Sequence, residues 1–422
     1  MKKLILTSLL GILVFNLSAQ NLERVKDMIR NKRLDNARTE IDKIAANEKY
    51  KKNAEVWYTK AKVYAAIADD STLAATVPNA REEAFNALKD YLKLDTKQAI
   101  TLQLDQFQPL LAIYQGYFRE GANAFNDKKF DAALEEFKRA GEVSTLMADK
   151  GWSNVKLDTT IILYSAVAAQ NARKDDEAAK YYQILADNKV ATGEEMADCY
   201  KWLADYFYRR DKPEEAQKYL TLGKELFPND GFWASMELDM LRDQGDKNLL
   251  FSKYEEVIRM NPGKYEYPYN YALELYDYGY KQDVAERPEN SVEIIARAEE
   301  NMKKALELNP ASHQAMLVIG QINYNRGVDL QNEAASIKST AAEDTKKRAE
   351  LRQNANKYYD AAIPYLEKVY TKLDPMGKLG PEDRNALKNA LDILIIIYDQ
   401  KNQKEKVKEL ETIYNNVESK HS

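Results

Sequence analysis

Chemistry in this chain would have to come from very few nucleophilic or metal-binding side chains. The 422 residues include two histidines, His313 and His421, and one cysteine, Cys199. These are too few to build a zinc site of the usual histidine and cysteine type. The sequence contains no glycine-rich phosphate loop and no local motif that pairs a serine or cysteine nucleophile with a histidine base. We therefore predict no catalytic residue, no metal site and no cofactor.

Carboxylates are the remaining candidates for chemistry. Asp239 and Asp243 are four residues apart and would share one face of a helix. Glycosidases use two carboxylates placed across a substrate cleft, so a hydrolase is one hypothesis to keep. Charged helix faces produce such pairs by chance, and a solvated surface is the simpler interpretation. We expect a protein that is not an enzyme.

The composition narrows the classes of partner. Lysine and arginine number 62 against 67 aspartates and glutamates, which gives a net charge of −5. A mildly acidic chain with interspersed charges lacks the basic stripe that nucleic-acid binding requires. Only 15 residues are glycine and no proline- or glycine-rich linker divides the chain. The sequence therefore predicts one continuous, almost wholly helical domain that does not bind nucleic acid.

The first twenty residues have the pattern of a secretory signal peptide. Two lysines precede a short apolar run from Leu4 to Leu17, and Ser18-Ala19-Gln20 follows it. We predict that residues 1–20 are removed and that the mature chain has no transmembrane segment; an uncleaved N-terminal anchor is the alternative. No cysteine lies near the cleavage point, so a lipid anchor is not expected. The chain is predicted to be exported, most simply to the periplasm, with possible association with the outer membrane.

One spacing recurs along almost the whole chain. A small or aliphatic residue is followed four positions later by a large apolar residue, three later by a small or apolar one, and five later by proline. The pattern is seen in Ala216, Leu220, Gly223 and Pro228, in Leu250, Tyr254, Val257 and Pro262, and in Ala298, Met302, Ala305 and Pro310. Small residues let two helix backbones approach, large ones fill the gap beside them, and proline ends the helix.

This spacing resembles the second helix of a tetratricopeptide repeat. The best matching unit carries the family's large, small and aromatic residues at Tyr117, Gly121, Ala124, Phe130, Ala133, Phe137 and Ala140. The resemblance implies an all-α, right-handed superhelical solenoid of about nine helix-turn-helix units over residues 21–418. The first and last units are degenerate, as capping repeats are. We expect residues 419–422, which include His421, to form a mobile tail.

Three units carry extra residues between their two helices, near 67–79, 280–292 and 328–356. Insertions at the same place in a repeat emerge along one edge of the stack. The third insertion is rich in alanine, glutamate and lysine, which favours helix. Thr340 followed by Glu343 could form a capping box that starts a second helix. We predict a long helical hairpin here; a disordered charged loop is the alternative.

The resemblance also implies where a partner binds, because these repeats line a concave groove with fixed positions of each first helix. Those positions give the candidate residues Asp198, Lys201, Asp205, Tyr208, Arg209, Phe232, Asp239, Arg242, Tyr267, Asn270, Glu274, Tyr278 and Tyr324. Tyrosine and arginine are the side chains that most often anchor interfaces. For any single position, a solvated or half-packed side chain remains the simpler interpretation.

The charges in this groove suggest what it would bind. Some members of the family hold a partner's C-terminal carboxylates with lysine, arginine and asparagine. Lys201 stands at a suitable position, but Asp205 and Asp239 would repel an anionic terminus. We expect a neutral or basic extended peptide rather than a carboxylate terminus.

Seven tyrosines gather between Tyr265 and Tyr280. Aromatic side chains at this density could stack on sugar rings or hold a peptide. They could equally pack between repeats in a unit that lacks tryptophan and phenylalanine, and we favour packing.

The leading hypothesis is a non-enzymatic interaction scaffold or adaptor in the cell envelope of a Gram-negative bacterium, with a composition similar to that of Bacteroidota envelope proteins. Its partner would be a protein or peptide of the envelope, bound in the preformed groove, with the insertion edge as a second contact site. The alternative is a glycan-binding component of nutrient uptake. The oligomeric state stays open.

Overall fold

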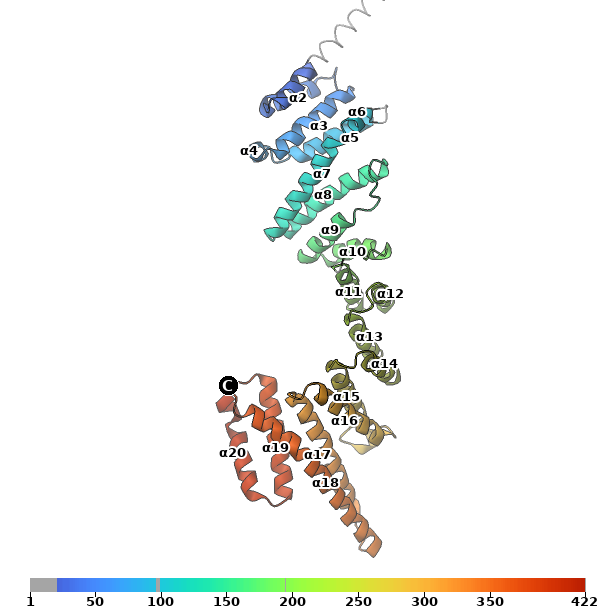
Figure 1. Cartoon of the computed structure of the whole chain (residues 1–422), viewed down its shortest axis with the longest axis vertical. Coiled ribbons are helices and arrows are strands. Elements are labelled where there is room, and N and C mark those ends of the chain that lie inside the picture. Colours follow the sequence, from blue (N-terminus) through green and yellow to red (C-terminus); the bar gives the residue numbers. More distant parts are fainter. Residues whose placement is uncertain (1–20, 96–98, 194, 422) are drawn as a thin grey trace, which may run out of the picture. The chain divides into compact units, whose positions relative to one another are not determined.

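A computed structural model describes residues 21–95, 99–193 and 195–421 of the chain (Figure 1). The predicted signal peptide, residues 1–20, lies outside the described residues. Helices make up the regular structure of the described part, which contains no strand. The all-α prediction is therefore confirmed.

The sequence predicted one continuous domain, and the structure divides the chain into two compact units. Unit 1 is Met1–Trp233 and unit 2 is Ala234–Ser422, so that the boundary falls in the first turn of α13. Each unit is a series of paired helices. Together, the described residues of the two units form the nine helix pairs that the repeat spacing predicted.

Unit 1 begins with a helix over residues 21–30. Its pairs are 21–30 with α2 (Leu34–Ala46), α3 (Ala54–Asp69) with α5 (Ala80–Leu94), α7 (Gln108–Asn126) with α8 (Phe130–Asp149), α9 (Thr159–Asn171) with α10 (Asp175–Asp187), and α11 (Glu195–Tyr208) with α12 (Pro213–Leu226). The first insertion holds the short helix α4 (Ser71–Ala74), and α6 (Ile100–Leu104) precedes α7.

Unit 2 carries the two longer insertions. Its pairs are α13 (Phe232–Gln244) with α14 (Lys247–Met260), α15 (Glu266–Gly279) with α16 (Ser291–Leu308), α17 (His313–Ser336) with α18 (Ala342–Leu373), and α19 (Pro381–Gln400) with α20 (Lys404–His421). A 3₁₀ turn, Val284–Glu286, lies in the insertion between α15 and α16.

The turns between paired helices repeat one backbone motif. The second residue after the first helix adopts a left-handed conformation, with φ of 61° at Lys128 and 60° at Arg173. The next amide then closes the helix end, as when the Lys129 amide donates to the carbonyl oxygen of Ala124 at 2.8 Å. This arrangement satisfies carbonyls that the helix end would otherwise leave unpaired. It also explains how a chain with few glycines makes such short connections.

Small residues set the distance between neighbouring helices, both within a pair and between consecutive pairs. A methyl group placed on Gly121 of α7 would lie 2.7 Å from the ring of Phe137 on α8. One placed on Gly223 of α12 would lie 2.3 Å from the ring of Trp233. Both glycines occupy small positions of the repeat pattern, and in each case a buried ring fills the space that the missing side chain leaves.

Tyrosines occupy many of the large positions, and several reach a carboxylate at the rim of the core. The hydroxyl group of Tyr64 donates to Asp42 at 2.7 Å, and the hydroxyl group of Tyr114 donates to Asp158 at 2.8 Å. Burial, together with the hydrogen bond to Asp95, raises the pKa of Tyr91 to about 12. These rings fill the space between helices while their polar ends stay hydrogen-bonded.

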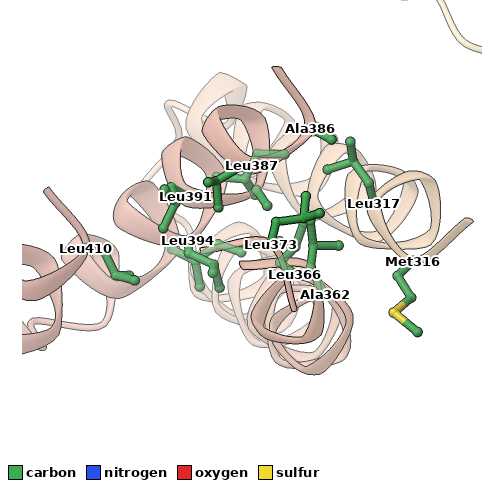
Figure 2. Close-up of a cluster of buried hydrophobic side chains, with 14 of the residues drawn as sticks. Met316, Leu317, Ala362, Leu366, Leu373, Ala386, Leu387, Leu391, Leu394 and Leu410 are labelled. Carbon is green, nitrogen blue, oxygen red and sulfur yellow. The ribbon is translucent and has the colours of Figure 1, made fainter. Parts of the chain in front are cut away.

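The last repeats share one continuous apolar core. Leu366 on α18, Leu391 and Leu394 on α19, and Leu410 on α20 are all buried and belong to one cluster (Figure 2). The same cluster includes Leu317 from α17. The core thus ties the final two helix pairs of unit 2 together.

The third insertion is a helical hairpin, as the sequence predicted. It is built by extension of α17 to 24 residues and of α18 to 32 residues. The predicted capping box is wrong, because α18 begins after Ala341 and its N-cap makes no side-chain hydrogen bond. The hydroxyl group of Ser339 accepts a hydrogen bond from the Ala341 amide instead. Thr340 therefore does not start the helix.

The predicted mobile tail is also wrong, because α20 continues to His421. The side chain of His421 is fully buried, and its Nδ1 lies 2.7 Å from the carbonyl oxygen of Gly377. Its own carbonyl oxygen accepts from the Leu379 amide at 3.2 Å and from Arg384. The end of the chain is held by the loop between α18 and α19.

Two further features concern reactivity and membranes. Cys199 on α11 is buried, as expected of a small core residue, and burial raises the pKa of its thiol to about 12.

Within the described ranges, no helix combines the length and apolar character needed to cross a bilayer.

Substitution of Gly121 by alanine should destabilise the protein even though alanine is the better helix former. The added methyl group would collide with the ring of Phe137, and overpacking of this kind costs about 1–3 kcal/mol. The measurement is urea unfolding of Gly121→Ala, followed by circular dichroism.

Gly141 of α8 is the matched control, since a methyl group there meets Ile161 at an ordinary 3.6 Å. Gly141→Ala should be neutral or should raise stability by up to about 1 kcal/mol, through helix propensity alone. Equal effects of the two substitutions would contradict a role for the Gly121 contact.

Candidate protein-binding surface

The predicted groove residues of unit 1 lie on α11 and at the start of α13. Lys201 is held between two carboxylates, with its ammonium group 2.6 Å from Asp230 and 3.1 Å from Asp198. The hydrogen bond to Asp230 raises the pKa of Lys201 above its usual value. Lys201 is therefore engaged within its own unit.

A second pair stands two turns further along α11. Arg209 donates through Nε to Asp205 at 2.8 Å, while 73% of the arginine side chain stays exposed. Both residues line a hollow of about 530 Å³. Its lining is Phe130, Gln170, Asn171, Arg173, Asp175, Trp202, Asp205, Tyr206, Arg209 and Arg210. The lining thus contains three arginines and two aspartates, so it carries a net charge of one positive unit.

An aromatic stack forms part of the lining of this hollow. The rings of Trp202 and Tyr206 lie 4.9 Å apart and nearly parallel, and the guanidinium carbon of Arg210 lies 3.8 Å from the centre of the Tyr206 ring. The hydroxyl group of Tyr206 donates to Asp176 at 2.6 Å. These contacts fix the rings and the arginine before any partner arrives.

Sequence reasoning missed Trp202, Tyr206 and Arg210. Two signals could have found them: aromatic residues spaced four apart on α11, and the adjacent arginines Arg209 and Arg210 at its end. The other predicted residues of unit 1 are half-buried. Tyr208 lies on α11, and Phe232 packs edge-on against Trp233 at 5.2 Å.

Another hollow of unit 1, of about 820 Å³, was not predicted. It lies between α5, α8, α9 and α10, so second helices of the repeats form much of its wall. Phe85, Ile161 and Ile184 contribute to its lining. The repeat positions used to predict the groove belong to first helices, and they could not locate this hollow.

In unit 2, the predicted charged residues form one network around Arg242. Its guanidinium group donates to Asp239 at 2.5 Å, to Glu274 at 2.6 Å and to the hydroxyl group of Tyr254 at 3.0 Å. Lys247 reaches the other oxygen of Glu274 at 3.1 Å. Asp239 is thus paired with an arginine rather than poised with Asp243 for hydrolysis, and the described residues contain no cluster of metal-binding side chains.

The predicted tyrosines of unit 2 pack partly into its core. Tyr267 and Tyr278 contact the apolar cluster around Tyr271, and Tyr278 meets Phe251 edge-on at 5.7 Å. Tyr324 lies 5.9 Å from the ring of Tyr359. These contacts agree with the packing interpretation of the tyrosine-rich segment. Of the remaining predicted residues, Asn270 is exposed on α15.

Burial alone would raise the pKa of Glu274, but hydrogen bonds from Arg242 and Lys247 outweigh it and hold the pKa below the usual 4.5. A lowered carboxyl pKa stabilises the fold above pH 4.5, and that contribution disappears as the pH falls through the folded-state value. Glu274→Gln should therefore lower the stability of unit 2 at neutral pH by about 1–3 kcal/mol and weaken its dependence on acid.

The test is urea unfolding of both proteins at pH 7 and at pH 3.5. Glu266 is exposed on the same helix, so Glu266→Gln serves as the control and should follow the unsubstituted protein. An unchanged loss of stability in acid for Glu274→Gln would refute the role given to this network.

Comparison with known proteins gives likenesses of fold only. The chain matches no protein-family model and no curated protein. A solved structure of the C-terminal part of a TPR repeat-containing protein from Cytophaga hutchinsonii is 14% identical, with a TM-score of 0.45, over 72% of this chain and 96% of that one. A TPR repeats protein from Bacteroides fragilis is 18% identical, with a TM-score of 0.28, over 67% and 98%.

Yeast Tom70 is a further example, at 14% identity and a TM-score of 0.27, over 96% of this chain and 92% of that one. The features of this chain itself carry the assignment: helix pairs at the predicted positions, and small residues facing rings within them. Both units are thus built from tetratricopeptide-like helical repeats, and this is the fold of the chain.

Proposed function

We propose that the protein is a non-enzymatic interaction scaffold that binds a partner protein or peptide through the first-helix surface of its repeats. The observation that supports this best is the hollow beside α11. There, Asp205 and Arg209 from the predicted groove adjoin the Trp202–Tyr206 stack and two further arginines. Aromatic and arginine side chains in a preformed hollow are the usual anchors of protein interfaces.

The geometry favours an extended segment with an apolar side chain placed on the aromatic stack. The rings are already ordered by Arg210 and Asp176, so little freedom is lost when they are covered. The repulsion expected from Asp205 and Asp239 is offset, because each is paired with an arginine. Polar groups of a partner could replace one member of these exposed ion pairs. Little folding free energy would be lost, because exposed ion pairs contribute little to the stability of the protein.

We further propose that this scaffold works in the cell envelope of a Gram-negative bacterium of Bacteroidota type. The support is the leader-like pattern of residues 1–20 and the composition of the chain. On this proposal the mature protein is exported to the periplasm, with or without association with the outer membrane.

The test is photo-crosslinking of the full-length, tagged protein in cells. A benzoylphenylalanine at position 209 should give reproducible crosslinks to one partner. The same group at position 93 should not, although Lys93 has a similarly exposed side chain, at 74%. Trp202→Ala should reduce the crosslinks by about tenfold or more, because it removes an anchoring ring.

Circular dichroism of Trp202→Ala checks that the fold is retained. Arg173→Glu, in the lining of the same hollow, is a second variant that removes only an exposed side chain. Equal crosslinking from positions 209 and 93, or none from either, would count against binding in this hollow. Separate fractionation of periplasm and membranes tests the proposed location.

A further inference from the structure

The sequence led us to expect a second contact site at the insertions. The two longer insertions of unit 2 meet at a hollow, whose position the repeat pattern did not predict. It has a volume of about 420 Å³ and lies between the segment that leads into α16 and the hairpin of α17 and α18. Arg287 comes from the loop before α16, and Val292 comes from the first turn of α16. The hairpin contributes Arg326, Leu330, Lys357 and Tyr358. None of these residues belongs to the predicted groove.

One buried ion pair joins the two insertions. Arg287 donates to both carboxylate oxygens of Asp329, at 2.7 and 3.1 Å, and only 7% of its side chain is exposed. Its Nε donates to the carbonyl oxygen of Lys281 at 2.6 Å, and its guanidinium carbon lies 4.3 Å from the centre of the Tyr280 ring. Arg287 is thus held by a bidentate ion pair, a backbone hydrogen bond and an aromatic ring, and these contacts make this wall of the hollow rigid.

The charges around the hollow do not cancel. Arg287 is matched by Asp329, and Arg326 is paired with Glu299. The ammonium group of Lys357 contacts only a neutral partner among the described residues, the side-chain oxygen of Asn354 at 3.1 Å. The hollow therefore carries one positive charge in excess, at its α18 side.

Apolar surface lies beside that charge. Val292 is 80% exposed at the start of α16, a high value for a large aliphatic side chain. Leu330 and Tyr358 line the hollow next to it and are only partly buried, and the Arg326 guanidinium carbon lies 5.6 Å from the centre of the Tyr358 ring. Exposed apolar side chains around a rigid hollow are typical of a surface that another protein covers.

We infer that this hollow is a second docking site, and that its occupant is a segment of a partner protein in which an aliphatic residue stands next to glutamate or aspartate. The aliphatic side chain packs on Val292 and Leu330, and the neighbouring carboxylate pairs with Lys357. The inference rests on the proposed scaffold function, but it concerns a different surface from the groove.

The experiment uses the full mature chain, labelled with a fluorophore, on an array of synthetic 12-residue peptides. The peptides vary leucine against serine and glutamate against lysine at adjacent positions. The unsubstituted protein should select leucine next to glutamate. Lys357→Glu should weaken binding of those peptides by about tenfold or more and shift the selection toward lysine, since the charge at the site is reversed.

Val292→Asp should abolish the preference for leucine, and it removes only an exposed side chain. Lys346→Glu is the matched control, because Lys346 lies on the same hairpin with 80% of its side chain exposed and does not line the hollow. It should leave the selection unchanged, and so should the groove variant Arg209→Glu.

The outcomes separate this site from the groove. Peptides lost only in Arg209→Glu would leave the scaffold proposal standing and overturn the second site. A selection that does not change in Lys357→Glu and Val292→Asp, or an array with no preference for acidic and aliphatic residues, would also overturn it.

Discussion

The repeats depend on how closely neighbouring helices approach each other. Gly121 leaves room for the ring of Phe137 and Gly223 leaves room for Trp233, so that each helix rests directly on an aromatic face of the next element. A core of this kind is only about one side chain thick, because each helix has a single partner layer on its buried side. Large side chains must therefore fill the space between helices, while their outer ends reach the solvent boundary.

That constraint accounts for the abundance of tyrosine, 28 residues in this chain. In a thin layer, the ring edge of a phenylalanine would reach the solvent boundary without a hydrogen-bonding group. Tyrosine ends in a hydroxyl group there, which can donate a hydrogen bond to a carboxylate. Tyr64 with Asp42 and Tyr114 with Asp158 are instances from different repeats. The tyrosine-rich α15 follows the same rule, since Tyr271 is buried while its hydroxyl group donates to Glu255 at 3.0 Å.

Features set by local spacing were predictable from the sequence, and features set by distant contacts were not. The helix pairs, the small position at Gly121 and the helical hairpin near 328–356 follow from periodicity and propensity, which act over one or two turns. The burial of His421 against Gly377 depends on a loop 44 residues earlier in the chain, which no local pattern encodes. The Trp202–Tyr206 stack is local, with two rings four residues apart on α11, and it was missed because the groove positions taken from the repeat family do not include these two residues.

The Arg287–Asp329 pair couples two insertions that the repeat pattern treats as independent. Arg287 and Asp329 lie 42 residues apart, and without Asp329 the almost fully buried Arg287 would be a charge without its partner. Shortening of either insertion would leave the other member of the ion pair without its partner. The fold therefore couples the lengths of the two insertions. Truncation of one insertion is therefore expected to loosen the other as well, so the two insertions form a single structural unit.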